Sequence, residues 1–180
     1  MGFRKLKRCL KTAASFFMSA FLVSFFIHKR VPVTLIQEEK TLMTQEEKQA
    51  FLADLHVGVL ALNDGAHGPL AVPIWYDYQP GGELWLLTAP YSRKGKLLAV
   101  GTRVSLVAQS EDPPYKYVSI EGPITSITAA DEDDLLAMAV RYLGSEEGGQ
   151  YADNNKVTGT GEVIVRVMPE HWLAADYSKS

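Results

Sequence analysis

Cysteine and histidine are scarce in this sequence. The 180 residues include a single cysteine, Cys9, which excludes an intramolecular disulfide and any cysteine-rich metal site. The four histidines are scattered without the close spacing typical of metal ligands: His28, His56, His67 and His171. We therefore expect no metal site.

Acidic residues are absent from the first 30 positions, where seven of the basic residues lie. The chain has 18 Lys and Arg against 21 Asp and Glu, so residues 31–180 keep 11 basic and 21 acidic side chains, a formal charge of −10. Nucleic-acid binding requires a broad positive surface that faces the phosphates. We therefore expect no nucleic-acid partner for this acidic body.

The sequence also lacks the short motifs of several enzyme classes. It contains no G-x-S-x-G, no H-E-x-x-H, no P-loop and no G-x-G-x-x-G. These absences argue against a serine hydrolase, a zinc peptidase, a P-loop nucleotidase and a dinucleotide-binding dehydrogenase. No internal repeat and no low-complexity tract is present either.

A long apolar run is present only near the start of the chain. Residues 12–27 are apolar apart from Thr and Ser, and basic residues flank them. Sixteen residues are fewer than the roughly 20 that a helix needs to cross a bilayer, and no small-residue cleavage site follows. Residues 1–40 are therefore an N-terminal extension or a possible membrane anchor, and membrane contact is expected only through residues 1–30. We expect the main domain, residues 43–180, to be cytoplasmic.

The main domain alternates strand-like runs with a few helical patterns. Thr44 and Glu47 form a capping-box pattern, and Leu135, Met138 and Ala139 share one helical face. A polar, glycine-rich stretch at 144–162 is expected to be a loop. The expected helices are 42–55, 92–100 and 129–144, and the expected strands are 56–64, 69–78, 83–89, 103–109, 115–127 and 163–177. Six strands with this spacing favour a small antiparallel barrel.

Residues 89–109 concentrate positive charge on this acidic body, with no acidic residue among them. Ser92 is a good N-cap, and the N-terminus of a helix offers free backbone N–H groups to an anion. Arg93, Lys94 and Lys96 would add charge to such a phosphate site. The alternative is a solvated basic helix that pairs with surface acids.

Several motifs, in order, resemble the pyridoxamine-5′-phosphate-oxidase-like split-barrel family, which includes flavin- and deazaflavin-dependent oxidoreductases. "SRKGKLL" running into "RVSLV" resembles the phosphate-holding segment of that family. The similarity extends over residues 43–180. It includes "VGVLAL" and "VPIWYDY" for the first two strands, "LWLLTA" for the third, "YVSIEGPIT" for the strand with a Glu-Gly step, and "MPEHWLAADYSK" for the tail of deazaflavin-type members.

The resemblance implies a mainly β fold with helices, namely a six-stranded antiparallel split barrel. It also implies a homodimer with the cofactor in a groove at the interface. Lys94 falls on the phosphate-binding lysine of the family, with Ser92, Arg93 and Lys96 beside it. The implied ring-lining residues are Val72, Pro73, Ile74 and Trp75, with Thr88 at the end of the next strand. Pro73 suits an edge or ligand-facing position because it donates no ladder hydrogen bond, and Trp75 could equally be core.

Two departures from the family narrow the implied function. Leu97 stands where relatives often have Asn, and no arginine-bearing C-terminal segment for vitamin B6 substrates is evident. The leading hypothesis is an oxidoreductase that uses the deazaflavin coenzyme F420 to transfer hydride to an unsaturated or aromatic small molecule. The alternatives are an FMN-dependent relative and a non-catalytic cofactor- or haem-binding protein.

The cofactor would carry the redox chemistry, so no dedicated catalytic residue is assigned. The polar side chains expected nearest the ring are Tyr76, Asp77, Thr88 and Tyr91. We expect an open groove, whose only lid would be the glycine-rich loop around Gly148 and Gly149.

Overall fold

The computed structural model describes residues 41–65, 67–155 and 161–179. Three helices are present in this part of the chain: α1 (Gln45–Ala53), α2 (Glu132–Leu143) and α3 (Ser145–Asn154). The strands are β1 (Gly58–Leu62), β2 (Leu70–Ile74), β3 (Tyr76–Tyr78), β4 (Leu84–Thr88), β5 (Arg103–Gln109), β6 (Lys116–Ala129), β7 (Val163–Val167) and β8 (His171–Asp176).

Two of the helices begin at capping residues that the sequence marks, Thr44 and Asp131. The Thr44 hydroxyl accepts a hydrogen bond from the backbone N–H of Glu47, and the Glu47 carboxylate accepts one from the N–H of Thr44. Asp131 and Asp134 form the same reciprocal capping box at the start of α2. Each box satisfies two backbone donors that helix geometry leaves without partners, which fixes where α1 and α2 begin.

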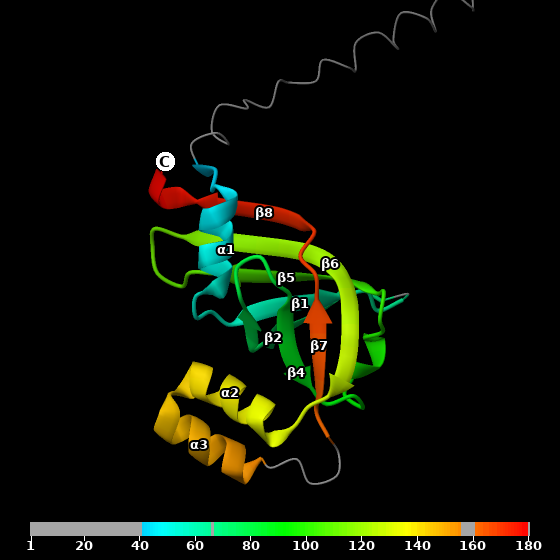
Figure 1. The fold of residues 1–180 in the computed structure, drawn as a ribbon. Coiled ribbons are helices and arrows are strands. Elements are labelled where there is room, and N and C mark those ends of the chain that lie inside the picture. Colours follow the sequence, from blue (N-terminus) through cyan, green and yellow to red (C-terminus); the bar gives the residue numbers. More distant parts are fainter. Residues whose placement is uncertain (1–40, 66, 156–160, 180) are drawn as a thin grey trace, which may run out of the picture. The chain divides into compact units, whose positions relative to one another are not determined.

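The strands form one curled antiparallel sheet in the order β2-β1-β5-β6-β7-β4-β3, and β8 pairs with β6. The 14-residue strand β6 belongs to both halves of this sheet, and its pairing with β7 shifts between Ile124 and Ser126. Figure 1 shows β6 bending from the β5–β8 side toward β7. This arrangement confirms the expected split barrel.

The six expected strands appear as eight because two of them are interrupted. Trp75 separates β2 from β3, and residues 168–170 separate β7 from β8. At the second break the chain crosses close over β6, where a Cβ on Gly122 would lie 1.8 Å from the carbonyl oxygen of Met168. Only glycine fits at this position, which explains the Glu-Gly step in the sequence.

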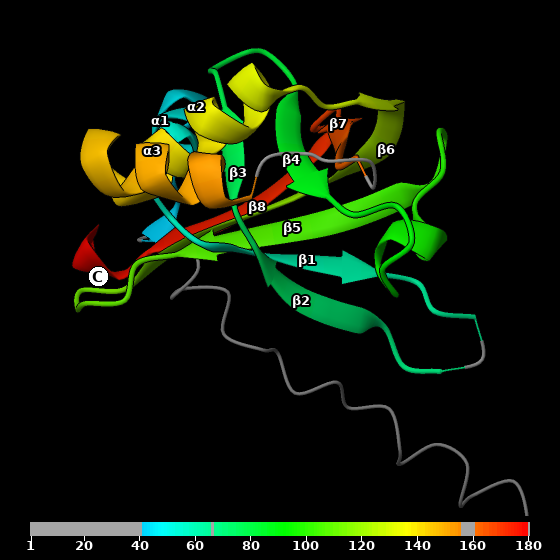
Figure 2. The same cartoon turned by 90° about the horizontal axis from the view of Figure 1, so that it is seen from below.

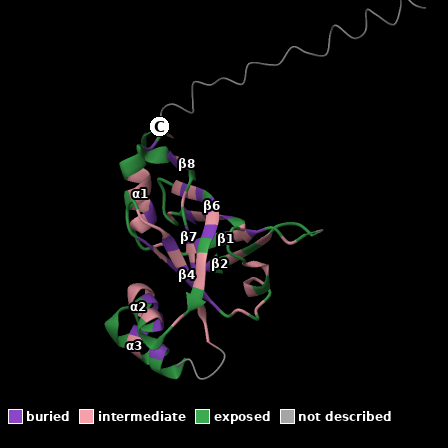
Figure 3. Ribbon diagram, turned by 45° about the vertical axis from the view of Figure 1, so that its right-hand side comes forward, coloured by how far each residue is buried: buried purple, intermediate pink, exposed green. Residues whose placement is uncertain are grey.

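Apolar side chains form two clusters. The larger one fills the barrel, and Tyr76, Leu86, Ile120 and Val165 are fully buried in it. The smaller one lies where α2 and α3 meet the sheet, and it includes Leu135 and Met138 of α2. Figure 3 shows these buried residues on the strands and on the inner sides of α2 and α3.

Two expected elements were wrong. Residues 92–100 form a compact turn and the one-turn 3₁₀ helix Gly95–Leu97, because the chain folds back until a Cβ on Gly95 would lie 2.3 Å from the oxygen of Ala89. Most of the glycine-rich stretch expected as a loop is helix α3. Gly148 faces the backbone of Val140 there, and the absence of a side chain lets α3 pack against α2.

The expectation of an N-terminal membrane anchor concerns residues 1–40, which lie outside the described residues. Within the described ranges, no helix is both long and apolar enough to span a membrane.

Candidate functional site

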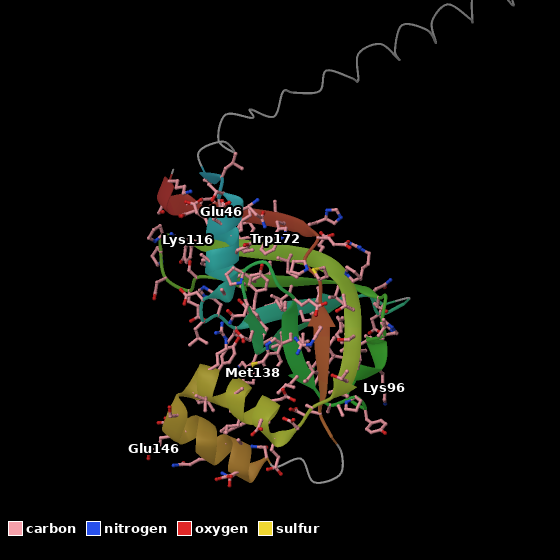
Figure 4. The ribbon with its side chains drawn as sticks, viewed as in Figure 1. Glu46, Lys96, Lys116, Met138, Glu146 and Trp172 are labelled. Atoms are coloured by element: carbon pink, nitrogen blue, oxygen red, sulfur yellow. The ribbon has the colours of Figure 1, made fainter. Side chains whose placement is uncertain are left out.

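A cavity of about 270 Å³ lies between the sheet and the hairpin of α2 and α3. Met138 lines it from α2, on the side of that helix that faces the strands in Figure 4. Among the described residues, those that line it are apolar or aromatic except for one glutamate: Val57, Pro73, Ile74, Trp75, Leu87, Leu135, Met138, Ala139, Tyr151 and Glu162. Three of the predicted ring-lining residues therefore share one cavity with both helices.

The break between β2 and β3 positions the strand wall of this cavity. The Tyr142 hydroxyl lies 2.7 Å from the His56 carbonyl oxygen and 3.0 Å from that of Tyr76, and it accepts a hydrogen bond from the Tyr76 N–H. The Tyr142 ring stacks on Trp75 with 4.8 Å between ring centroids, and Tyr151 of α3 contacts the same indole. Trp75 is thus part of the smaller core cluster and part of the cavity wall.

Glu162 is the acidic residue of the cavity. It directly precedes β7, and its carbonyl oxygen accepts a hydrogen bond from the N–H of Ala130. Burial raises the pKa of the Glu162 carboxyl, and the positive charge of Lys94 partly offsets that rise. Within the described ranges, its carboxylate forms no hydrogen bond or ion pair.

The helix expected to begin at Ser92 is not present, so no α-helix N-terminus stands behind the predicted anion site. The N–H of Gly95 donates to the Ser92 hydroxyl, and the N–H of Lys96 donates to the Ser92 carbonyl oxygen. The Ser92 hydroxyl itself donates to the Ala89 carbonyl oxygen at 2.8 Å. These groups close the turn on itself, and the segment continues as one 3₁₀ turn in place of the expected helix.

Three of the four basic side chains in this segment have acidic neighbours. Arg93 forms an ion pair with Asp64 in the turn between β1 and β2, at 2.6 Å. Arg103 pairs with Glu170 at 2.6 Å, and Lys94 acts on Glu162. Lys96 is exposed, and Figure 4 labels it near the C-terminal end of β6. Arg93 and Arg103 therefore pair with surface acids, as the alternative interpretation of this segment predicts.

Two further predicted residues lie beside the cavity and not in its lining. Val72 faces inward opposite Leu60 and packs against the larger core cluster. Thr88 is buried opposite Val163, and its hydroxyl has no hydrogen-bond partner within the described residues. A buried hydroxyl without a partner is costly, so Thr88 fits a position that meets a polar group of a ligand.

The side chains expected nearest the ring are occupied elsewhere or lie outside the cavity lining. Tyr76 is fully buried in the barrel and donates to the Leu52 carbonyl oxygen, and burial raises its pKa strongly. Asp77 pairs with Arg141 at 3.2 Å. Tyr91 is 77% exposed.

Sequence reasoning missed the helical half of the cavity and its carboxylate. The apolar face of α2 was identified, but only as a core face, and α3 was expected to be a loop. No motif marks Glu162 in the sequence. Its one local signal is its place directly before a strand whose residues are apolar apart from Arg166.

The fold and the site define a class: a split barrel with a cavity between its sheet and a helical hairpin. The model of the family "Pyridoxamine 5′-phosphate oxidase" matches residues 44–173. The chain belongs to this family, as its motifs predicted. No curated protein matches the chain.

Solved structures show the same fold. A conserved hypothetical protein from Mycobacterium tuberculosis is 26% identical, with a TM-score of 0.59, over 78% of this chain and 89% of the other. A structure described as an F420 reductase is 19% identical, with a TM-score of 0.57, over 69% of this chain and 94% of the other. An FAD- and heme-binding protein from Mycobacterium smegmatis is 17% identical, with a TM-score of 0.54, over 76% of this chain and 73% of the other.

Proposed function

We propose that this protein is a flavin-type oxidoreductase that uses the deazaflavin F420 to reduce an unsaturated or aromatic small molecule. The observation that carries the proposal is the cavity, lined mainly by apolar and aromatic residues, that joins Pro73, Ile74 and Trp75 to the α2–α3 hairpin. Family membership and the fold shared with an F420 reductase support it. When bound in reduced form, the cofactor supplies a hydride, and the protein supplies binding and orientation.

The residues on and beside the cavity fit such a cofactor. The apolar side chains and the indole of Trp75 in its lining suit a flat aromatic ring. The cavity volume of about 270 Å³ lies slightly below the usual range of ligand pockets. The buried Thr88 hydroxyl has no hydrogen-bond partner among the described residues, so it could form a hydrogen bond with a polar group of the cofactor. Lys94 and Lys96 would hold the phosphate tail through their positive charge. Ser92 would shape the turn through its hydrogen bonds, and Arg93 would contact the phosphate while it also forms its ion pair with Asp64.

We further propose that the chain forms a homodimer through the outer face of the sheet. Pairing registers align one outward-facing row across five strands: Pro73, Val59, Val107, Ser119 and Leu173. Leu173 is 64% exposed and Val59 39% exposed, and Figure 2 shows β1, β2 and β5 on the side opposite α2 and α3. Pro73 belongs both to this row and to the cavity wall, so a second copy would complete the cavity.

Titration tests the cofactor. The purified protein would be titrated with F420 and with FMN, followed by absorbance and fluorescence. Tight F420 binding with turnover supports the proposal. FMN binding alone would favour the FMN-dependent alternative, and cofactor or haem binding without turnover would favour a binding protein.

The matched variants Lys94→Ala and Lys48→Ala test the phosphate contact. A charge-assisted contact is worth about 1.5–3 kcal/mol, so Lys94→Ala should weaken cofactor binding roughly tenfold to more than a hundredfold. Lys48 lies on α1, outside the cavity lining, and its loss should leave binding unchanged. Equal affinity of both variants would contradict the role of Lys94.

A further inference from the structure

Glu162 stands out among the titratable groups of the cavity. Among the described residues of the lining it is the only carboxylate, and the others are apolar residues, Trp75 and Tyr151. Its backbone is held by the hydrogen bond from Ala130 and by the start of β7, while its carboxylate has no partner within the described residues. The backbone of Glu162 is therefore held in place, and its carboxyl is available to a bound molecule.

We propose that Glu162 delivers the proton that a hydride acceptor takes up in this cavity. The inference rests on the proposed function, because it requires a reduced flavin or deazaflavin as the source of the hydride. It differs from the expectation that solvent supplies this proton through an open groove, because it assigns the proton to a side chain of the cavity lining.

The step balances without a further reactant. The unsaturated bond of the acceptor gains a hydride at one atom, and its π electron pair moves to the neighbouring atom. That atom forms a bond to the proton as the O–H bond of the Glu162 carboxyl breaks. The glutamate is left as a carboxylate near the positive charge of Lys94, and water returns the proton after product release.

The surroundings of Glu162 match this role. Apolar neighbours favour the neutral, protonated carboxyl, because burial penalises the charged form. Lys94 favours the carboxylate and so limits the rise of the pKa. The phenol of Tyr151 is the other titratable group in the described lining of the cavity. A carboxyl with a raised pKa is a better proton donor near neutral pH than an exposed one.

Single-turnover oxidation of the bound reduced cofactor tests the step in the matched variants Glu162→Gln and Glu83→Gln. Glu83 precedes β4 as Glu162 precedes β7, but it lies at the opposite end of that strand pair and outside the cavity lining. Glu162→Gln should slow the reaction roughly 10²-fold or more, with cofactor affinity retained. Glu83→Gln should react like the natural chain.

The pH profile separates proton donation from a structural role. With Glu162 as donor, the rate should be highest at low pH and fall as pH rises through the raised pKa of the carboxyl. Glu162→Gln should lose this fall. An unchanged rate and profile in Glu162→Gln, in a protein that binds cofactor and turns over, would refute the inference and leave the proposed function intact.

Infrared difference spectra of the cofactor-free protein provide a readout independent of turnover. The natural chain should show a protonated carboxyl band that titrates above the ordinary glutamate value of 4.5 and that is missing in Glu162→Gln. A band that persists in the variant, or none in the natural chain, would overturn the inference. If the natural chain binds neither cofactor, the proposed function fails, and the inference fails with it.

Discussion

Replacing Gly148 by alanine should separate the two helices that form one side of the cavity. A Cβ at this position would lie 2.7 Å from the Cα and N atoms of Val140, whereas ordinary contacts begin at 3.4 Å. The helices must therefore move apart by about 0.7 Å, the difference between these distances. Overpacking of this kind costs about 1–3 kcal/mol.

Gly149 is the matched control on the same helix. A Cβ there meets nothing within 4 Å. Both substitutions gain about 1 kcal/mol of helix propensity, because alanine loses less backbone entropy than glycine. This gain cancels in the comparison, so Gly148→Ala should be less stable than Gly149→Ala by about 1–3 kcal/mol.

Urea unfolding followed by far-ultraviolet circular dichroism measures both variants. Gly149→Ala should exceed the natural chain in stability. Since Met138 and Tyr151 line the cavity from α2 and α3, Gly148→Ala should also weaken cofactor binding. Equal stability of the two variants would refute the close packing of α3 on α2. It would instead support a loop at this glycine-rich stretch.

Two other predictions concern the packing around the site and the C-terminal strand. Tyr142→Phe keeps the ring stacked on Trp75 but removes the hydroxyl that bonds the backbone at His56 and Tyr76; urea unfolding should show a loss of about 1–3 kcal/mol, against no change for the exposed Tyr115→Phe. Burial alone would raise the pKa of the Asp176 carboxyl, but hydrogen bonds from Ser178 and Lys116 outweigh it and lower this pKa to about 2. The stability that the carboxylate contributes is therefore fully present above 3.8, its pKa in the unfolded chain, and is lost as pH falls toward 2. The urea midpoints of Asp176→Asn and of the natural chain should converge over this pH range. Parallel pH profiles of the two proteins would contradict this.

Much of the fold follows from local sequence signals. The capping boxes at Thr44 and Asp131 fix where two helices begin because they satisfy backbone donors within a few residues. Alternating apolar residues fix the strands, since successive side chains point to opposite faces. The order of these elements, with the Glu-Gly step and the basic segment, identified the family without any structure.

Only the tertiary structure decided the nature of the site. Helix α3 has two glycines and weak local preference, and it forms because Gly148 lets it pack against α2. The segment at 92–100 has good helix formers, but it folds back on Ala89 and forms one 3₁₀ turn. Glu162 becomes a cavity residue because β7 pairs with β4, which places the start of β7 near Leu87 of the cavity lining. Such contacts join residues far apart in sequence, so local patterns carry no record of them, whereas caps and strand alternation depend on near neighbours and are readable from the sequence.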